Sequence, residues 1–438
     1  MNPLVCGVDS STQSTKVELR EVTTGALVAT AAAPHPPTTP PRSEQDPAAW
    51  WEALRSALAQ VGAHLERVVA VAVAGQQHGM VVVDDHDAVL RPAKLWNDTE
   101  SSEQADALVA SLGAEAWARR SGSVPVAAFT ITKLAWLAEH EPASFAAMAR
   151  VMLPHDWLTF QLTGNHVTDR GDASGSGWWN PGAGAVDTEL LGLVDGERDW
   201  AAMVPRVLEA TEAAGVVSAA AAAATGLPAG CAVAAGSGDN MGAALGLGLR
   251  AGDVVVSLGT SGTAYAVSDQ PTADASGAVA GFADATGNFL PLVCTLNATK
   301  VTDAFQMLLG AEREDFVDLA LAASPGADGV TLVPYLDGER TPNRPNATGH
   351  LGGITNASTR ADLARAAHEG VVCGLLAGVD ALASAGVETA GRYFLVGGGS
   401  RSPAYRRIVA DLTQRQIRVP DADEVVATGA CVQAAALH

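Results

Sequence analysis

The feature that most constrains this chain is a hairpin pattern that occurs once in each half. Residues 5–17 and residues 254–264 both read as an apolar, β-branched run, a tight turn of small residues and a second strand. Thr12 in the first copy aligns with Thr260 in the second. Small residues and hydroxyls let backbone N–H groups close around phosphate oxygens. One such turn is usually an ordinary hairpin, but the matched pair predicts a nucleotide held between two similar lobes.

The two copies differ in one informative way. Asp9 in the first copy corresponds to Ser257 in the second. Carboxylate oxygens are preferred ligands of Mg²⁺, so the first hairpin is predicted to serve the metal. Lys16 closes this hairpin, where its ammonium group could reach a phosphate. An ordinary solvated strand residue explains Lys16 equally well.

Composition narrows the function classes. The chain has 438 residues, of which 48% are hydrophobic and 17% charged, and its formal net charge is −21. These values are typical of a globular protein with two or three domains. With no basic run, the charge argues against nucleic-acid and anionic-membrane partners. We see no leader and no uncharged apolar run of membrane-spanning length. Five scattered cysteines without metal-ligand spacing favour a reduced, cytoplasmic protein.

The order of expected elements is similar in the two halves. Strands come first and helices later in each, which predicts an α/β fold with two lobes, residues 1–247 and 248–438. Residues 68–74 and 231–235 are predicted strands, and residues 359–384 a long helix. Asp46 is a good N-cap, and Pro47 suits the first position of the helix that follows.

Four polar clusters each follow an apolar strand, which is where α/β sheets collect their ligands. They are residues 9–16, 76–78, 239–240 and 397–402. Asp239 follows a Gly-Ser-Gly turn and precedes a helix, so its carboxylate could accept a proton from a substrate hydroxyl. A helix cap is the other interpretation, and the local sequence favours it.

The other two clusters predict different ligands. The amide and imidazole groups of residues 76–78 suit sugar hydroxyls, which need donors and acceptors, although a structural role is equally consistent with them. The glycine-rich segment 397–402 suits a phosphate at a helix N-terminus. It lacks dinucleotide-binding spacing, and it could be a structural turn. The charged segment 336–342 is expected to be an ordinary solvated loop.

At these segments the chain resembles the FGGY family of carbohydrate kinases, in the actin/hexokinase-like ATPase superfamily. The similar segments follow the family's order over nearly the whole chain, and they most resemble family members that act on D-xylulose. They comprise residues 43–47, 74–79, 95–98, 257–262, 334–336 with 338–342, and 397–399 with 401–402.

The resemblance implies two RNase H-like lobes with ATP, Mg²⁺ and a ketopentose in the cleft between them. By the family's pattern, Asp239 would be the catalytic base and Asp9 would help to hold Mg²⁺. The implied sugar contacts are Gln77, His78, Asp239 and Asn240. The implied nucleotide contacts are Thr12, Gly259, Thr260, Gly398 and Ser402, to which Lys16 is added from its place in the first hairpin.

Three departures from the family pattern bear on the site. Gln77 stands where the D-xylulose kinases often have Met, so the sugar pocket is expected to be more polar. Ser10 and Ser11 replace an apolar residue and a Gly in the first hairpin. We expect their larger side chains to restrict how closely a phosphate can approach this loop. Ser237 replaces a Gly before the expected base.

The expected activity is ATP-dependent phosphorylation of D-xylulose to D-xylulose 5-phosphate. Another substrate, such as L-ribulose, gluconate or glycerol, is the nearest alternative. A sugar-responsive regulator is opposed by Asp9 and Asp239 together and by the lack of a basic arm. An actin-like assembling ATPase would have no use for the polar cluster of Gln77 and His78. The expected partners are the sugar and ATP, and a homodimer is left open.

Overall fold

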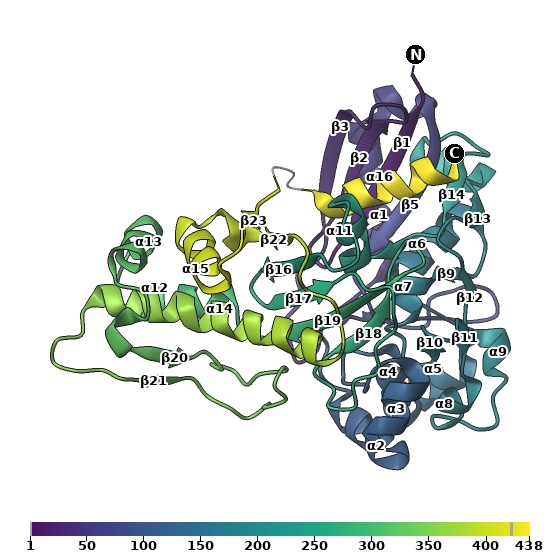
Figure 1. Cartoon of the computed structure of the whole chain (residues 1–438). Helices are drawn as coiled ribbons and strands as arrows, with labels where there is room; N and C mark the ends of the chain where they lie inside the picture. The colour runs from purple at the N-terminus through teal and green to yellow at the C-terminus, as the bar shows by residue number, and fades with distance from the viewer. Residues whose placement is uncertain (1, 421–423) are drawn as a thin grey trace.

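The computed structural model of the chain describes residues 2–420 and 424–438. Two sheets organise it (Figure 1). The strands of the first sheet are β1 (Leu4–Ser10), β2 (Ser14–Glu21), β3 (Leu27–Pro34), β5 (Val68–Gly75), β13 (Ala213–Val216), β14 (Ala232–Ala234) and β15 (Ser237–Gly238). Those of the second are β16 (Val254–Leu258), β17 (Gly262–Ala266), β18 (Ala280–Ala283), β19 (Phe289–Thr295), β22 (Tyr393–Val396) and β23 (Ile417–Arg418).

The two sheets share one arrangement. The first runs in the order β13-β14-β5-β1-β2-β3, with β15 beside β5, and the second in the order β18-β19-β17-β16-β22-β23. In each, an antiparallel hairpin lies next to a parallel strand: β1 and β2 beside β5, and β16 and β17 beside β22. Both hairpins predicted from the sequence are present, and each occupies the same place in its sheet.

The helices surround these sheets. In the first half they are α1 (Pro47–Gln60), α2 (Ser102–Leu112), α3 (Ala114–Ser121), α4 (Thr130–His140), α5 (Pro142–Ala147), α6 (Pro154–Thr163), α7 (Arg170–Ala173), α8 (Thr188–Gly192), α9 (Trp200–Met203), α10 (Ala219–Thr225) and α11 (Asp239–Gly246). In the second half they are α12 (Thr299–Leu308), α13 (Arg313–Ala322), α14 (Arg360–Ser384), α15 (Pro403–Thr413) and α16 (Val425–Leu437). Short strand pairs connect them: β4 (Glu44–Gln45) with β7 (Ala93–Lys94), β6 (Val81–Val83) with β8 (Arg150–Met152), β9 (Val167–Asp169) with β12 (Arg206–Leu208), β10 (Trp179–Asn180) with β11 (Ala185–Val186), and β20 (Thr331–Val333) with β21 (His350–Gly352).

Local signals explain where the helices begin. Asp46 caps α1 by accepting a hydrogen bond from the N–H of Ala48, and Pro47 is the first helical residue, as predicted. The apolar face of α1 is buried against the first sheet through Trp50 and Leu54. The long helix α14 is confirmed close to its predicted bounds, and Thr359 caps it.

The carboxyl ends of three parallel strands meet at one edge of the first sheet. Ser10 at the end of β1 and Gly238 at the end of β15 both pair with Gly75 at the end of β5. The predicted strand over residues 231–235 is present as β14, and a break at residues 235–236 separates it from β15. Gly236 has a φ of 86° there, and a Cβ at this position would lie 2.6 Å from the carbonyl oxygen of Val73. The interruption directs the chain into α11.

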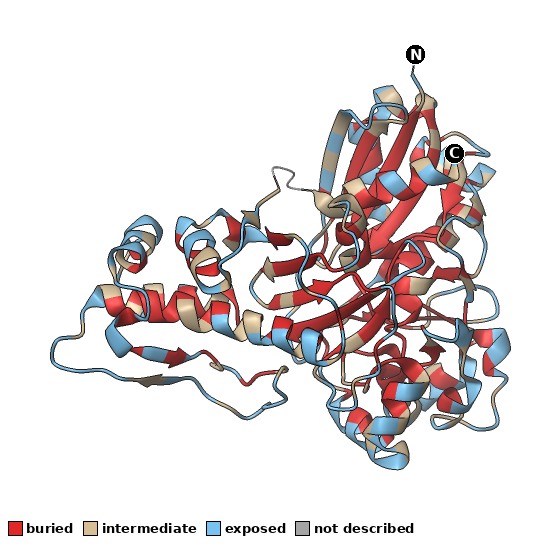
Figure 2. Cartoon of the chain, viewed as in Figure 1, coloured by how far each residue is buried: buried red, intermediate tan, exposed pale blue. Residues whose placement is uncertain are grey.

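The second sheet is covered on both faces. On one side α14 and α15 pack on it through an apolar core that includes Leu375 and Ile408. On the other side its residues share a core with the segment between β6 and α9, for example Tyr265 with Trp178. Figure 2 shows the strands of both sheets as largely buried. Helix α14 has the length and mean hydropathy of a membrane-spanning helix, yet its buried face belongs to this core, as in a globular domain.

The last helix returns to the first sheet. In Figure 1, α16 (yellow) lies against α11 and the purple strands that begin the chain. Its residues Ala430 and Cys431 pack with Val5 and Ala72. A division of the chain at residue 248, which we propose from the sequence, therefore leaves α16 packed on the first sheet.

Candidate active site

The predicted sugar-side residues come together where β5 and β15 end. The amide nitrogen Nδ2 of Asn240 donates to Oε1 of Gln77 at 2.9 Å and to Oδ1 of Asp239 at 3.0 Å. The backbone N–H of Asn240 also donates to Asp239 Oδ1, at 2.8 Å. A Cβ at Gly238 would lie 2.6 Å from the Gln77 side chain, so only glycine lets that side chain approach so closely. Asn240 thus fixes the carboxylate of Asp239 relative to Gln77.

Asp239 is the first residue of α11, and the N-cap is Gly238. The capping role favoured by the local sequence is therefore wrong. Burial raises the pKa of Asp239 to about 6, against the opposing effect of its hydrogen bonds from Asn240. A carboxyl group with a raised pKa can take up a proton at a pH close to neutral, which is what a general base requires.

Asp9 lies close enough to Asp239 for their charges to interact. Its pKa is raised to about 7, chiefly by burial, while Lys16 opposes the shift and Asp239 adds to it. Asp9 Oδ1 is buried and has no hydrogen-bond partner within residues 2–420 and 424–438. An unpartnered carboxylate oxygen beside a second carboxylate suits a divalent cation.

Lys16 points across the first hairpin toward the start of α16. Its ammonium nitrogen lies 2.7 Å from a carboxylate oxygen of Glu424. Neither Lys16 nor Glu424 is fully buried, so the pair is open to solvent. The predicted phosphate contact of Lys16 would have to compete with this ion pair.

His78 is held in an unusual backbone conformation with a φ of 65°. Its backbone N–H donates to Asp172 Oδ1 at 3.2 Å, and its ring stacks on Phe129 at a centroid distance of 5.3 Å. Burial lowers the pKa of His78 well below its usual value, with smaller contributions from Lys133 and Arg340. The imidazole is therefore neutral near pH 7, and one ring nitrogen can donate while the other accepts.

Several buried polar atoms in this region have no hydrogen-bond partner within the described part of the chain. They are Asp9 Oδ1, Gln76 Nε2, Gln77 Nε2 and His78 Nδ1. Buried polar groups are nearly always hydrogen-bonded in folded proteins. A cluster of exceptions at the ends of two adjacent strands points to a polar ligand that supplies the missing partners.

The predicted nucleotide residues of the second half line one cavity of about 820 Å³. Gly259 and Thr260 follow β16, and Gly398 and Ser402 follow β22. The Ser402 hydroxyl is buried and lacks a hydrogen-bond partner among the described residues. Because β16 and β22 are parallel neighbours, the loops after them open on the same edge of the second sheet.

Thr12 is placed differently from its counterpart Thr260. Its hydroxyl accepts from Nε1 of Trp96 at 3.0 Å and donates to Oε1 of Gln76 at 3.3 Å. Thr12 and Lys16 are not among the residues that line the large cavity. The first hairpin therefore faces the sugar-side residues, and its contact with a nucleotide remains a prediction.

Sequence reasoning missed a buried charged cluster beneath this site. His155 is fully buried, with its Nε2 atom 3.0 Å from Asp169 Oδ1, 3.2 Å from Asp156 Oδ1 and 3.5 Å from Asp172 Oδ2. These carboxylates outweigh the effect of burial and raise the pKa of His155 to about 9. The adjacent His155 and Asp156 were the available sequence signal. Asp172 links the cluster to the backbone of His78.

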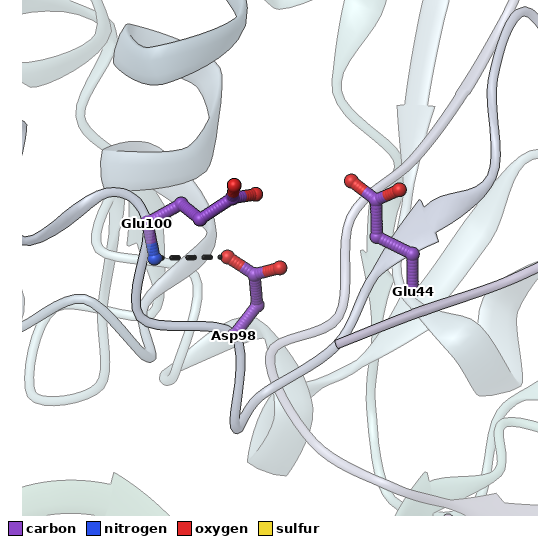
Figure 3. Close-up of side chains that lie close together, drawn as sticks. All are labelled: Glu44, Asp98 and Glu100. Carbon is purple, nitrogen blue, oxygen red and sulfur yellow. Dashed lines mark hydrogen bonds between the residues drawn. The ribbon is translucent and has the colours of Figure 1, made fainter. Parts of the chain in front are cut away.

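A group of carboxylates away from the site has the spacing of a metal centre. Glu44, Asp98 and Glu100 lie close together, as Figure 3 shows. The buried ammonium group of Lys94 already occupies their centre, 3.0 Å from Asp98, 2.5 Å from Glu100 and 3.4 Å from Glu44. The side chain of Lys94 also lies over the ring of Trp136. This cluster is a buried ion-pair network, and lysine takes the place that a cation would need.

The chain is similar in sequence and fold to known carbohydrate kinases. The N-terminal domain of the FGGY family of carbohydrate kinases matches residues 4–246, and its C-terminal domain matches residues 254–438. A xylulose kinase of Streptomyces coelicolor is 50% identical over 438 residues, which cover 99% of this chain and 88% of that protein. The crystal structure of xylulose kinase from Bifidobacterium adolescentis has a TM-score of 0.91 at 42% identity and covers 100% of this chain and 93% of its own.

A more distant structure shares the fold alone. Plasmodium falciparum glycerol kinase with ADP has a TM-score of 0.87 at 19% identity, over 99% of this chain and 89% of that one. These likenesses confirm the expected α/β fold class with two RNase H-like lobes of the actin/hexokinase-like type.

Proposed function

This chain belongs to the FGGY family of carbohydrate kinases, and we propose that it transfers the γ-phosphoryl group of ATP to the O5 hydroxyl of D-xylulose. Membership of the family makes it a sugar kinase that uses ATP. The relatives named xylulose kinase, which match at up to 50% identity over 99% of the chain, support D-xylulose as the sugar. Glycerol kinase shares only the fold, at 19% identity, and does not favour the alternative substrate.

The observation that carries the proposal is the hydrogen-bonded set of Gln77, Asn240 and Asp239. Both side-chain amide hydrogens of Asn240 are used within it, so the carbonyl oxygen of Asn240 is left to accept from a sugar hydroxyl. Gln77 Nε2 has no hydrogen-bond partner among the described residues and could donate to a sugar oxygen. His78 Nδ1 also lacks a hydrogen bond within the described chain, although it lies 4.0 Å from Asp172 Oδ1. A polyhydroxylated substrate needs this mixture of donors and acceptors.

Asp239 would act as the general base. All its hydrogen bonds from Asn240 go to Oδ1, which leaves Oδ2 to take the proton from the C5 hydroxyl as it attacks the γ-phosphorus. Its pKa of about 6 keeps the group mostly ionised at pH 7 and still basic enough to accept a proton.

The phosphate side of the reaction would be shared between the lobes, which we propose as residues 1–247 and 248–438. The backbone of Gly259 and Thr260 would bind phosphate oxygens, and Gly398 and Ser402 border the space for the nucleoside. Asp9 Oδ1 fits a ligand of Mg²⁺, because it is buried and has no partner in the described chain. When bound, Mg²⁺ neutralises charge that develops on the phosphates. Lys16 would approach the phosphates after leaving Glu424.

The location that we propose is the cytoplasm, where ATP is available. All five cysteines are free, and Cys373 is exposed. Free thiols are typical of proteins from reducing compartments.

An ADP-release assay against ketopentoses, aldopentoses, polyols and gluconate tests the proposal. D-xylulose should give the highest kcat/KM, and the product should carry its phosphate on C5. Asp239→Asn should lower kcat by about 10²- to 10⁴-fold and leave ATP binding intact. Asp85→Asn, at an exposed carboxylate, is the matched control and should retain full activity. Higher kcat/KM for another sugar would reject D-xylulose, and wild-type turnover by Asp239→Asn would reject the base.

A further inference from the structure

The segment between β20 and β21 is tied to the second phosphate hairpin. Glu339 is only 2% exposed. Its carboxylate accepts from the backbone N–H of Leu296 at 2.6 Å and from Nδ2 of Asn297 at 3.0 Å. Asn297 Nδ2 also donates to the carbonyl oxygen of Gly338 at 2.7 Å. The expectation of an ordinary solvated loop is therefore wrong at this point, because a buried carboxylate anchors it.

The residues that follow Asn297 are hydrogen-bonded to the residues proposed to bind phosphate. Directly after Asn297, the backbone N–H of Ala298 donates to the carbonyl oxygen of Thr260 at 3.2 Å. Thr299 then donates to the carbonyl oxygen of Gly259 through its backbone N–H at 3.0 Å and through its hydroxyl at 2.9 Å. The position of Arg340, next to Glu339, is thereby fixed relative to the turn of the second hairpin.

Arg340 extends from this anchor toward the sugar side. With Phe129 it lines a small cavity between the two halves of the chain, and Phe129 stacks on the ring of His78. The charge of Arg340 also contributes, after burial and Lys133, to the low pKa of His78. Arg340 therefore lies between the residues predicted to hold the sugar and those predicted to hold the phosphates.

The guanidinium group of Arg340 is available to a ligand. It is half-buried, and it forms no hydrogen bond or ion pair with any residue in the ranges 2–420 and 424–438. The nearby ammonium group of Lys133 already has partners within the protein. Its Nζ atom donates to the carbonyl oxygens of Ala127 and Ala128 at 2.7 and 2.5 Å.

The positive charge of Arg340 would add little to the binding of a neutral sugar, but it suits an anionic phosphoryl group. D-xylulose carries no charge, whereas the transferred group and the sugar phosphate are anions. A guanidinium group offers two parallel N–H donors that match phosphate oxygens. The chain has a net charge of −21, so the protein as a whole repels anions. An unpaired arginine at this point would attract a phosphoryl group locally.

We propose that Arg340 binds the phosphoryl group during its transfer from ATP to the sugar and then holds the phosphate of the sugar phosphate product. The inference rests on the proposed function, since it assigns a further residue to the same reaction. Arg340 touches the transferred group and has little contact with the free sugar. Its loss should therefore lower kcat far more than it raises the KM for D-xylulose.

Steady-state kinetics of three variants test this. Arg340→Gln should lower kcat by about 10²- to 10³-fold, the range for loss of one donor to a developing anion, with the KM for D-xylulose changed less than about threefold. Arg340→Lys should recover part of kcat, because it restores the charge without the paired donors. Arg344→Gln, which removes an exposed arginine from the same segment, should behave as wild type. Circular dichroism checks that each variant folds, and Arg340→Lys carries the test if Arg340→Gln does not fold.

Calorimetric titration supplies a second readout. D-xylulose 5-phosphate should bind Arg340→Gln about 10- to 100-fold more weakly than wild type, as expected for hydrogen bonds to a charged group, while D-xylulose binds equally well. Unchanged kcat and product affinity would overturn the inference, as would equal losses in Arg344→Gln. The proposed function fails separately, if the wild-type protein does not phosphorylate D-xylulose at all.

Discussion

Asp9 and Asp239 are residues of one type whose surroundings suit them to different tasks. Asp239 has Oδ1 occupied by Asn240, whereas Asp9 Oδ1 has no hydrogen-bond partner in the described chain. Burial raises the pKa of both. The first arrangement suits the general base that we propose, and the second leaves an oxygen for the proposed Mg²⁺.

The first prediction is a pH limit on turnover set by Asp239. Its carboxylate must be ionised to accept a proton, and its pKa is raised to about 6. Activity should therefore be full above the pKa and fall as the pH drops through about 6, approaching tenfold for each further unit. A pH profile of kcat at saturating D-xylulose and ATP measures this. A profile that stays flat down to pH 4.5 would mean that another group accepts the proton.

The second prediction concerns the buried ammonium group of Lys94. Lys94→Met leaves Asp98 buried without its partner, and breaking a buried pair in this way costs about 3–5 kcal/mol. Urea denaturation followed by circular dichroism measures the free energy of unfolding. The matched control is Arg119→Met, which removes an exposed partner of Glu115 and should cost less than about 1 kcal/mol. Stabilisation of Lys94→Met by Mg²⁺ or Ca²⁺ would instead show that the three carboxylates can hold a metal.

At the scale of elements, the crossing of α11 and α16 depends on glycine. A Cβ at Gly429 would lie 1.8 Å from the carbonyl oxygen of Gly242. A Cβ at Gly246 would lie 2.0 Å from the carbonyl oxygen of Val425. The two helix backbones are therefore in direct contact, which no larger residue allows. This contact holds the end of the chain on the first sheet, next to the helix that begins with Asp239.

The third prediction is that Gly429→Ala destabilises the protein. The added methyl group meets backbone, which cannot rotate away, so we expect a loss of about 1–3 kcal/mol or more. Gly374→Ala in α14 is the control, because nothing lies within 4 Å of its added Cβ. Alanine is the better helix former, so that variant should gain up to about 1 kcal/mol. Equal denaturation midpoints for the two variants would contradict the close packing of α11 on α16.

At the scale of the whole molecule, the two sheets are joined by one shared core. Residues of the second sheet such as Tyr265 and Leu290 pack with Phe129 and Trp178 from the first half. The sugar-side residues come from the first half, and the large cavity is lined by the second. If the two halves close on their ligands, as we predict below, this shared core is where they would pivot.

The fourth prediction is closure on binding both substrates. A ligand shifts a conformational equilibrium only through contacts that differ between the states, and ATP is expected to bridge both halves. D-xylulose with a non-hydrolysable ATP analogue should reduce the radius of gyration in small-angle scattering more than D-xylulose alone. Gly398→Val is the control, since it places a larger side chain in the cavity that we propose for the nucleotide and should abolish the additional compaction. An equal radius with and without the analogue would exclude closure driven by ATP.

Features that depend on neighbouring residues could be predicted from the sequence. These include the two hairpins, the start of α1 at Asp46 and Pro47, and the polar residues that follow β5 and β15. Strand alternation, capping and turn chemistry act over a few residues, so they leave a readable pattern. The resemblance to the kinase family then gave a role to residues such as Asp239, which local pattern had favoured as a cap.

Contacts between side chains that carry no local pattern became visible only in the folded chain. The fold places Glu339 on Asn297, His155 among three aspartates, Lys94 among three acidic residues, and α16 on the first sheet. Glu339 and α16 meet partners that are far apart from them in the chain. Lys94 and Asp98 are only four residues apart, but no local pattern shows that they are buried together. Burial likewise raises the pKa of Asp239, and this burial exists only in the folded chain. The sequence gives the chemical type of each side chain. Its neighbours, and therefore its pKa and its role, are determined only when the chain folds.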